Sequence, residues 1–183
     1  MSFWSDVNFE PKRQFRFKVL FTPVKGEELS FLAKAVDRPS YTVGSTSHAF
    51  FNHTFHFPGR VTWNTISLTL VDAVSPDASR TLMDYLADIG YADPSSTAAE
   101  PNSRDGQTIT KQTATKSLGT IKIVEYGTDE RSGSKAIAHG TWELKNAFIT
   151  DAAFGSLSYD SEELVDITLT LQYDWATYSK GGR

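Results

Sequence analysis

The chain has 183 residues, a formal net charge of −4 and no cysteine. The missing cysteines exclude disulfides, thiolate metal ligands and a cysteine nucleophile. No cluster of Lys and Arg is present to grip nucleic acid phosphates. The chain has no run of about 18 apolar residues, and its start is too polar for a secretory signal, so we expect no membrane insertion. Length and composition predict one globular domain over residues 1–183.

The first predicted strands follow an unpatterned N-terminal arm, residues 1–12. From Arg13 to Thr22 apolar and polar residues alternate, which indicates a β-strand with one dry face. A turn at Pro23–Glu28 leads into a second predicted strand, Leu29–Val36, and Pro39 ends it.

An aromatic segment follows from Tyr41 to Phe57. It holds four phenylalanines, Phe50, Phe51, Phe55 and Phe57, and in one extended chain Phe50 would oppose the other three. Such a segment either packs in the core or projects and contacts a neighbouring subunit, since aromatic residues are enriched at interfaces. We expect a turn at Pro58–Gly59 and then a strand, Val61–Asp72, with alternate residues in the core.

A short amphipathic helix is predicted next. Ser75 is the expected N-cap, Pro76 the first helical residue and Asp77 a favourable charge at the N-terminus. An apolar stripe follows at helical spacing: Ala78, Leu82, Leu86 and Ile89. Gly90 ends the helix.

Residues 92–117 are almost free of apolar side chains, so we expect a polar loop insertion there. Strands are predicted at Leu118–Tyr126, Lys135–Lys145, around Phe148, and at Val165–Trp175. The predicted fold class is mainly β: an antiparallel β-sandwich or barrel of about seven to eight strands with one flanking α-helix.

The last strand is the cleanest. It alternates apolar residues with Asp166, Thr168, Thr170, Gln172 and Asp174, and it lacks the Lys, Pro or Gly that blunt exposed edges. It must therefore be paired within the fold or across a subunit boundary.

No pattern of catalytic or metal-binding residues stands out. His48, His53 and His56 lie close in sequence, but His53 and His56 would point to opposite faces of an extended chain. The sequence has no Gly-x-Ser-x-Gly and no phosphate-binding glycine motif, and its paired carboxylates lie in polar turns. We expect no enzyme activity, no metal and no cofactor.

Read in order, several blocks resemble the tail tube protein family of contractile-tailed bacteriophages. They are "FRFKVLF", "FLAKAVDRPS", a long excursion closing on "HFPGRVTWNTISLTLVD", the helix "DASRTLMDYLADIG" and the final "HGTWELKNAFITDAAFGSLSYDSEELVDITLTLQYDW". The resemblance covers roughly residues 15–90 and 118–175.

The resemblance implies a structural virion protein. Six copies would form a ring whose strands pair across subunits, and rings would stack into the hollow inner tail tube that sheath contraction drives through the host envelope. Tyr41, Phe50 and Phe51 are the expected contacts with the next ring. The implied partners are other copies of the chain, the sheath protein, the baseplate tube initiator and the tape-measure protein, with assembly in the host cytoplasm.

DNA would pass through such a tube only as cargo. A lumen of neutral or acidic side chains would not hold phosphates. We therefore expect Asp166, Thr168, Thr170, Gln172 and Asp174 to be candidates for the lumen surface.

Three alternatives stay open. The chain could be a tube-initiating or tube-terminating baseplate protein, or the tube component of a related injection or secretion system. A carbohydrate-binding β-sandwich is the alternative from a different class, and it predicts glycan binding by the isolated monomer.

Overall fold

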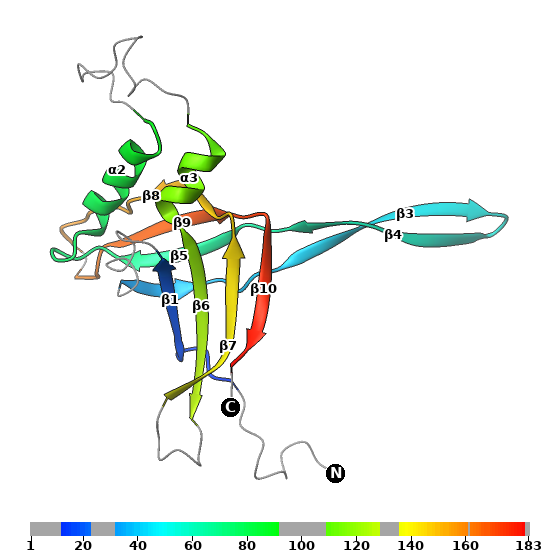
Figure 1. The fold of residues 1–183 in the computed structure, drawn as a ribbon, viewed down its shortest axis with the longest axis horizontal. Coiled ribbons are helices and arrows are strands. Elements are labelled where there is room, and N and C mark those ends of the chain that lie inside the picture. Colours follow the sequence, from blue (N-terminus) through cyan, green and yellow to red (C-terminus); the bar gives the residue numbers. More distant parts are fainter. Residues whose placement is uncertain (1–11, 23–31, 92–108, 129–135, 161, 182–183) are drawn as a thin grey trace.

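The structure, a computed structural model, describes residues 12–22, 32–91, 109–128, 136–160 and 162–181 (Figure 1). Most of the predicted arm and of the polar insertion lies outside these ranges. The described chain forms ten strands and two helices. The strands are β1 (Phe17–Thr22), β2 (Ala33–Val36), β3 (Tyr41–Phe50), β4 (His53–Trp63), β5 (Ile66–Val71), β6 (Thr120–Thr128), β7 (Ala136–Lys145), β8 (Phe148–Ala153), β9 (Asp166–Gln172) and β10 (Trp175–Lys180).

The strands form two four-stranded sheets and one separate hairpin. The first sheet has the order β1-β6-β7-β10, the second has the order β2-β5-β9-β8, and β3 pairs only with β4. All pairs are antiparallel. The predicted fold class is therefore confirmed, although the strands are more numerous than expected and a second helix is present.

The core lies between the two four-stranded sheets. Period-two alternation buries Ile66, Leu68 and Leu70 of β5 against Ile167, Leu169 and Leu171 of β9. Val19 and Phe21 of β1, Ile121 of β6 and Leu144 of β7 cover them from the other sheet. Together these side chains form one continuous cluster, which fixes the two sheets relative to each other.

The final predicted strand is two strands in different sheets. It breaks at Tyr173 and Asp174, where the Asp174 amide donates to the Lys145 carbonyl at 3.0 Å and the chain turns from the second sheet into the first. The alternation changes phase there, because Ala176 is buried while Trp175 is exposed. The predicted single strand to Trp175 is therefore wrong at its end.

Pairing of β9 lies wholly within the chain. The strand is flanked by β5 and β8, so the expectation of pairing across subunits is wrong for residues 166–172. In the described part of the chain, the outer strands of the two sheets are β1, β10, β2 and β8. Pairing between copies stays a prediction for these edges only.

The segment before β5, residues 41–65, also differs from expectation. The turn lies at Phe51 and Asn52, not at Pro58–Gly59, and Phe51 adopts a positive φ of 51°. The predicted strand Val61–Asp72 is the end of β4, a break at Asn64 and Thr65, and β5. Pro58 lies inside β4, opposite Ser45, because a proline is tolerated in an edge strand.

Helix α2 (Ala78–Asp88) buries Ala78 and Leu82 of its predicted stripe. Its N-cap is Asp77 rather than Ser75: the Asp77 carboxylate accepts from the Arg80 amide at 2.9 Å. Gly90 ends the helix as predicted. The Gly90 amide donates to the Ala87 carbonyl, and the Tyr91 amide donates to the Leu86 carbonyl.

Helix α3 (Lys111–Leu118) lies inside the predicted polar loop. A capping box between Thr110 and Thr113 starts the helix, and only Ala114 and Leu118 are buried. Two apolar residues amid Thr, Lys and Gln give too weak a stripe to detect in the sequence. Among the described residues, no helix is long and apolar enough to cross a membrane.

The core assignment predicts a sharp contrast between adjacent residues of β9. Leu169 is fully buried and Thr168 is exposed. Leu169→Lys should destabilise the fold by more than about 4 kcal/mol, because an unpaired ammonium is buried, whereas Thr168→Lys should change stability by about 0.5 kcal/mol or less. Chemical denaturation followed by circular dichroism measures both. A folded Leu169→Lys protein would contradict the assignment.

Candidate assembly interface

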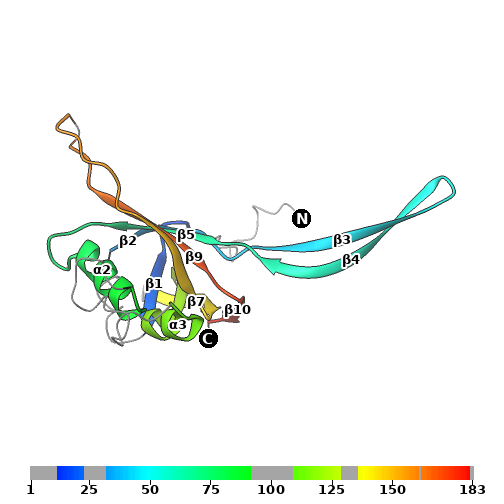
Figure 2. The same ribbon diagram turned by 90° about the horizontal axis from the view of Figure 1, so that it is seen from above.

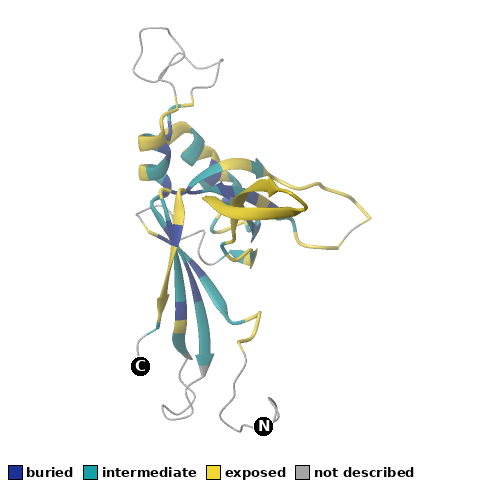
Figure 3. Cartoon of the chain, turned by 90° about the vertical axis from the view of Figure 1, so that its right-hand side faces the viewer, coloured by how far each residue is buried: buried dark blue, intermediate teal, exposed yellow. Residues whose placement is uncertain are grey.

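The β3–β4 hairpin (residues 41–63) stands clear of the rest of the molecule (Figures 1 and 2). Every residue from Tyr41 to Thr62 is exposed, so the hairpin is yellow throughout in Figure 3. Five large aromatic side chains are included: Tyr41 is 60% exposed, Phe50 57%, Phe51 88%, Phe55 52% and Phe57 57%. The sequence left core packing and projection open for this segment, and the structure shows projection.

The base of the hairpin is fixed to the core by aromatic side chains. Tyr41 pairs with Trp63 across the two strands, with ring centroids 5.4 Å apart, and Trp63 lies 5.9 Å from buried Tyr173. The Asn64 amide donates to the Ser40 carbonyl at 2.9 Å, and the Asn64 side chain donates to the Ser40 hydroxyl at 3.0 Å. These contacts fix the base of the hairpin to the core, so that β3 and β4 continue outward from the β2–β5 pair.

The register of the hairpin places its tip aromatics on one face. Phe50 is opposite His53, His48 is opposite Phe55, and Thr46 is opposite Phe57. Cross-strand partners share a face of a ribbon. This tip face (Thr46, His48, Phe50, His53, Phe55 and Phe57) is thus aromatic. Ser45, Ser47, Ala49, Thr54, His56 and Pro58 lie on the other face.

The expectation that Phe50 opposes Phe55 and Phe57 is therefore wrong. That parity holds for one extended chain, whereas a two-residue turn folds the segment back and brings Phe50 to the side of Phe55. Phe55, Phe57 and Trp63 are further residues of this site that the sequence pattern alone does not distinguish. Asn52 between two aromatic runs was the signal that could have placed the turn.

A bulge divides the hairpin into a tip and a base. Val43 pairs with Val61 but Ser45 pairs with Pro58, so β4 holds one extra residue. Beyond the extra residue, the odd-numbered side chains of β4 point to the opposite face of the ribbon. The base residues Val61 and Trp63 consequently face away from the tip aromatics. Two glycines meet at the bulge: a Cβ on Gly59 would lie 3.1 Å from the Gly44 carbonyl oxygen.

The predicted contacts with the next ring fall at both ends of the hairpin. Phe50 and Phe51 are at the tip with ring centroids 4.4 Å apart. Tyr41 is at the base, nine residues from Phe50, which corresponds to roughly 30 Å of extended strand. The structure thus brings Phe50 and Phe51 together and separates them from Tyr41.

Four of the five lumen candidates lie on the outer face of the second sheet. Asp166, Thr168, Thr170 and Gln172 alternate with the buried residues of β9. The neighbouring strand adds Ser67, opposite Thr170, and Thr69, opposite Thr168. The face is polar with little charge, because Lys34 of β2 forms an ion pair with Asp166.

Asp174 has a different role. It lies between β9 and β10, where its two carboxylate oxygens each accept from Lys111 of α3 at 2.7 Å and one accepts from Asn146 at 2.7 Å. The hydrogen bond from Lys111, then that from Asn146, holds the pKa of Asp174 below its usual value. Asp174 ties α3 to the corner between the sheets, so it leaves the set of lumen candidates.

The described residues include no group of three or more His, Asp or Glu side chains that could hold a metal ion. His48 and His53 share the tip face, and His56 lies on the other face. What the arrangement offers is a large, exposed aromatic surface on a projecting arm.

Solved structures of contractile injection systems include chains with a similar fold. No family model matches the chain, and no curated protein matches it. A solved chain from the sheath/tube terminator structure of the extracellular contractile injection system PVC, in its extended state, is 16% identical with a TM-score of 0.60; the match covers 94% of this chain and 99% of that one.

Two further structures match in the same way. A chain from the extended PVC sheath–tube complex is 19% identical over 95% of this chain and 94% of that one, with a TM-score of 0.60. A chain from the tube-terminating cap of the anti-feeding prophage is 18% identical over 98% and 99%, with a TM-score of 0.61. The chain therefore has the fold of contractile injection system tube and terminator proteins.

The bulge predicts that the two glycines differ in tolerance. At Gly59 a Cβ would press on the Gly44 backbone at 3.1 Å, whereas at Gly44 the nearest atom is 3.5 Å away, an ordinary contact. We expect Gly59→Ala to distort the hairpin and Gly44→Ala to leave it unchanged. Amide chemical shifts of β3 and β4 measure this. Equal shifts in the two variants would contradict the bulge geometry.

The Asp174 ion pair predicts a pH-dependent contribution to stability. The pKa of Asp174 is lower in the folded chain than its usual value of 3.8. The carboxylate therefore stabilises the fold fully at pH values above 3.8, and this stabilisation disappears as the pH falls through the folded-state pKa. Asp174→Asn should therefore lower the unfolding midpoint in urea at neutral pH. The difference in urea midpoint between the two proteins should disappear in acid. A difference that is independent of pH would refute the assignment.

Proposed function

We propose that this chain is a structural subunit of a contractile-tail-type tube. Copies form a six-membered ring, and rings stack into a hollow tube that sheath contraction drives into a target envelope. The observation that carries the proposal is the β3–β4 hairpin, a projecting arm with an aromatic face that no part of the described chain covers. The fold shared with tube and terminator proteins supports the same role.

A rough magnitude shows why such an arm suits a repeating assembly. Three phenylalanines, each about half exposed, offer on the order of 300 Å² of apolar surface, or about 7 kcal/mol at 25 cal/mol per Å². Association costs about 4–15 kcal/mol in lost freedom. One such contact is therefore marginal. Six contacts made by one ring with the next act together, because after the first forms the others are effectively intramolecular.

The outer face of the second sheet is our proposed lumen surface. Thr168, Thr170 and Gln172 carry no charge, and Asp166 is paired with Lys34. Because the Lys34 charge is paired with Asp166 and Thr168, Thr170 and Gln172 add no cation, this face would hold phosphates only weakly, so DNA would pass without binding. Tyr41, Phe50 and Phe51 remain the proposed contacts between rings, now joined by Phe55 and Phe57.

The expected setting is the tail of a bacteriophage particle, assembled in the host cytoplasm. Its partners would be the sheath, a baseplate initiator and a tape-measure protein. A related injection machine would use the same tube. The alternative of a tube-terminating protein is favoured by the similarity to the anti-feeding prophage cap. A terminator makes one ring and stops, whereas a tube subunit elongates.

Electron microscopy of the purified protein tests the proposal. We expect hollow rods or stacked six-membered rings. Single rings that never stack would favour the terminator, and a persistent monomer that binds glycans would favour the carbohydrate-binding sandwich.

The tip face predicts opposite outcomes for adjacent substitutions. Phe50→Asp places a charge on the aromatic face and should abolish stacking, while Ala49→Asp places the same charge on the other face and should allow it. Both proteins should melt at the temperature of the unaltered chain, because neither residue is part of the core. Rods from both variants, or from neither, would mean that the tip face does not form the contact between rings.

A further inference from the structure

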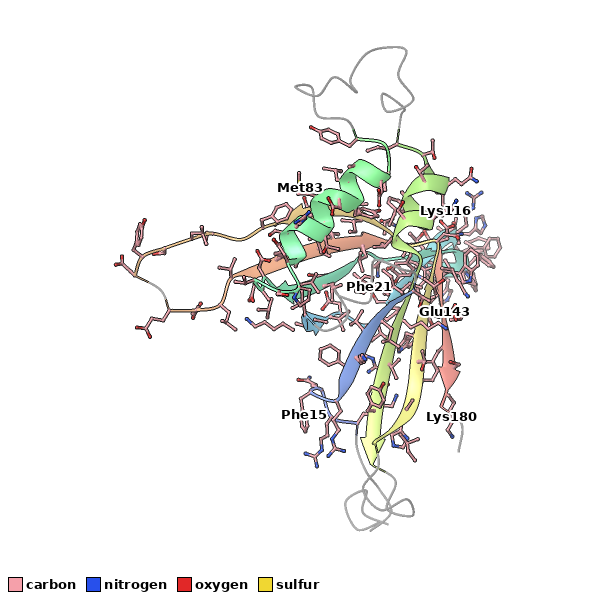
Figure 4. The ribbon with its side chains drawn as sticks, turned by 60° about the vertical axis from the view of Figure 1, so that its left-hand side comes forward. Phe15, Phe21, Met83, Lys116, Glu143 and Lys180 are labelled. Atoms are coloured by element: carbon pink, nitrogen blue, oxygen red, sulfur yellow. The ribbon has the colours of Figure 1, made fainter. Side chains whose placement is uncertain are left out.

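A second arm leaves the molecule between β8 and β9. The described parts of this β8–β9 loop (residues 154–160 and 162–165) project from the body on the side away from the hairpin (Figures 2 and 4). It exposes four large apolar side chains: Phe154, Leu157, Tyr159 and Leu164. Four such residues on one short connection are not explained by folding of the single chain.

The neck of the loop is held in place. Gly155 has a φ of +75°, and a Cβ there would lie 2.6 Å from the Asp166 carbonyl oxygen, so the two ends of the loop pass in close contact. The Asp72 amide donates to the Val165 carbonyl at 2.8 Å, and Lys34 pairs with Asp166 at the start of β9. The loop is therefore presented in a defined direction.

The register puts the two arms at opposite ends of the second sheet. Ile66, which follows the hairpin, pairs with Leu171 at the end of β9, whereas Val71 pairs with Asp166 at its start. The hairpin thus leaves from one end of the β5–β9 pair and the loop from the other. One molecule cannot bring its own two arms together.

The two arms carry charges of opposite sign. From residue 41 to residue 63 the chain has no Asp or Glu but carries the positive charge of Arg60, together with His48, His53 and His56. From residue 154 to residue 165 it has no Lys, Arg or His but carries Asp160, Glu162 and Glu163. Each arm also exposes large apolar side chains.

We infer that the tip face of the hairpin binds the β8–β9 loop of a second copy of this chain. The inference rests on the proposed function and identifies the receiving surface of the contact between copies. Because the two surfaces differ, the contact is heterologous, so each added copy presents a fresh hairpin and a fresh loop. Head-to-tail growth of an assembly follows from that geometry.

Cysteine cross-linking tests the inference, since the chain has no cysteine of its own. Thr46→Cys lies on the tip face and the adjacent Ser47→Cys on the other face. Each is mixed with Ser156→Cys in the loop of a separate copy and oxidised. We expect a disulfide-linked dimer with Thr46→Cys and its loss with Ser47→Cys, because a disulfide requires the two Cα atoms to lie within about 7 Å.

The outcomes separate the inference from the proposed function. Rods without the Thr46–Ser156 cross-link would overturn the loop as receiving surface and leave the tube proposal standing. Cross-linked chains without rings or rods would support the arm contact and contradict the tube. Equal cross-linking by Thr46→Cys and Ser47→Cys would overturn the assignment of the tip face, rather than the other face, as the binding surface.

Charge exchange gives a second test. His53→Glu on the tip face should raise the concentration needed for assembly about tenfold, equivalent to about 1.4 kcal/mol, and Glu162→Lys in the loop should restore assembly when combined with it. His56→Glu on the other face is the matched control and should have no such effect. Failure of the combined variant to recover, or an equal loss with His56→Glu, would count against the pairing.

Discussion

A two-stranded ribbon has no second layer, so neither of its faces is buried by the fold that contains it. Isolated hairpins are at best marginally stable in water. The β3–β4 hairpin of this chain is long and exposed along its length, yet it carries phenylalanines on one face of its tip. Burial of those side chains yields free energy only when another surface covers them. The rest of the structure anchors the hairpin so that its tip stays exposed to such a surface.

The body of the molecule acts as a rigid mount for this arm. Trp63 and Tyr41 continue the core outward through Tyr173, so the hairpin base inherits the stiffness of the two packed sheets. The Gly44–Gly59 contact permits a bulge that turns the aromatic face of the tip away from that of the base. At the opposite end of the same sheet, close packing at Gly155 fixes the β8–β9 loop. The proposed tube, which would transmit force, needs such firm connections between its contact surfaces.

The sequence predicted the fold well where burial alone decides. The alternation of β5 and β9, the apolar stripe of α2 and the glycine after it all appear in the structure, because each pattern reports one buried face. Errors occurred where a tertiary contact decides instead. The corner at Tyr173 and Asp174 depends on Lys145 and Lys111, and α3 depends on the surface beneath Ala114 and Leu118. Neither partner is visible in local periodicity.

The candidate site was predicted in part. Phe50 and Phe51 are at the tip as an interface would require, but their grouping with Phe55 and Phe57 depends on a turn whose position the sequence pattern did not give. Asp174 followed the alternation of the last strand and still has a separate structural role. Alternation identifies the solvent side of a strand, but it does not say which exposed side chains are engaged by a neighbouring element.

Hydrogen exchange read by mass spectrometry, comparing dispersed with assembled protein, tests the central claim most directly. An arm that requires a partner should exchange its amides much more slowly after assembly, from Tyr41 through Trp63, while the already buried β5 and β9 change little. Unchanged exchange along the hairpin in assembled protein would show that the aromatic arm is not where the copies meet.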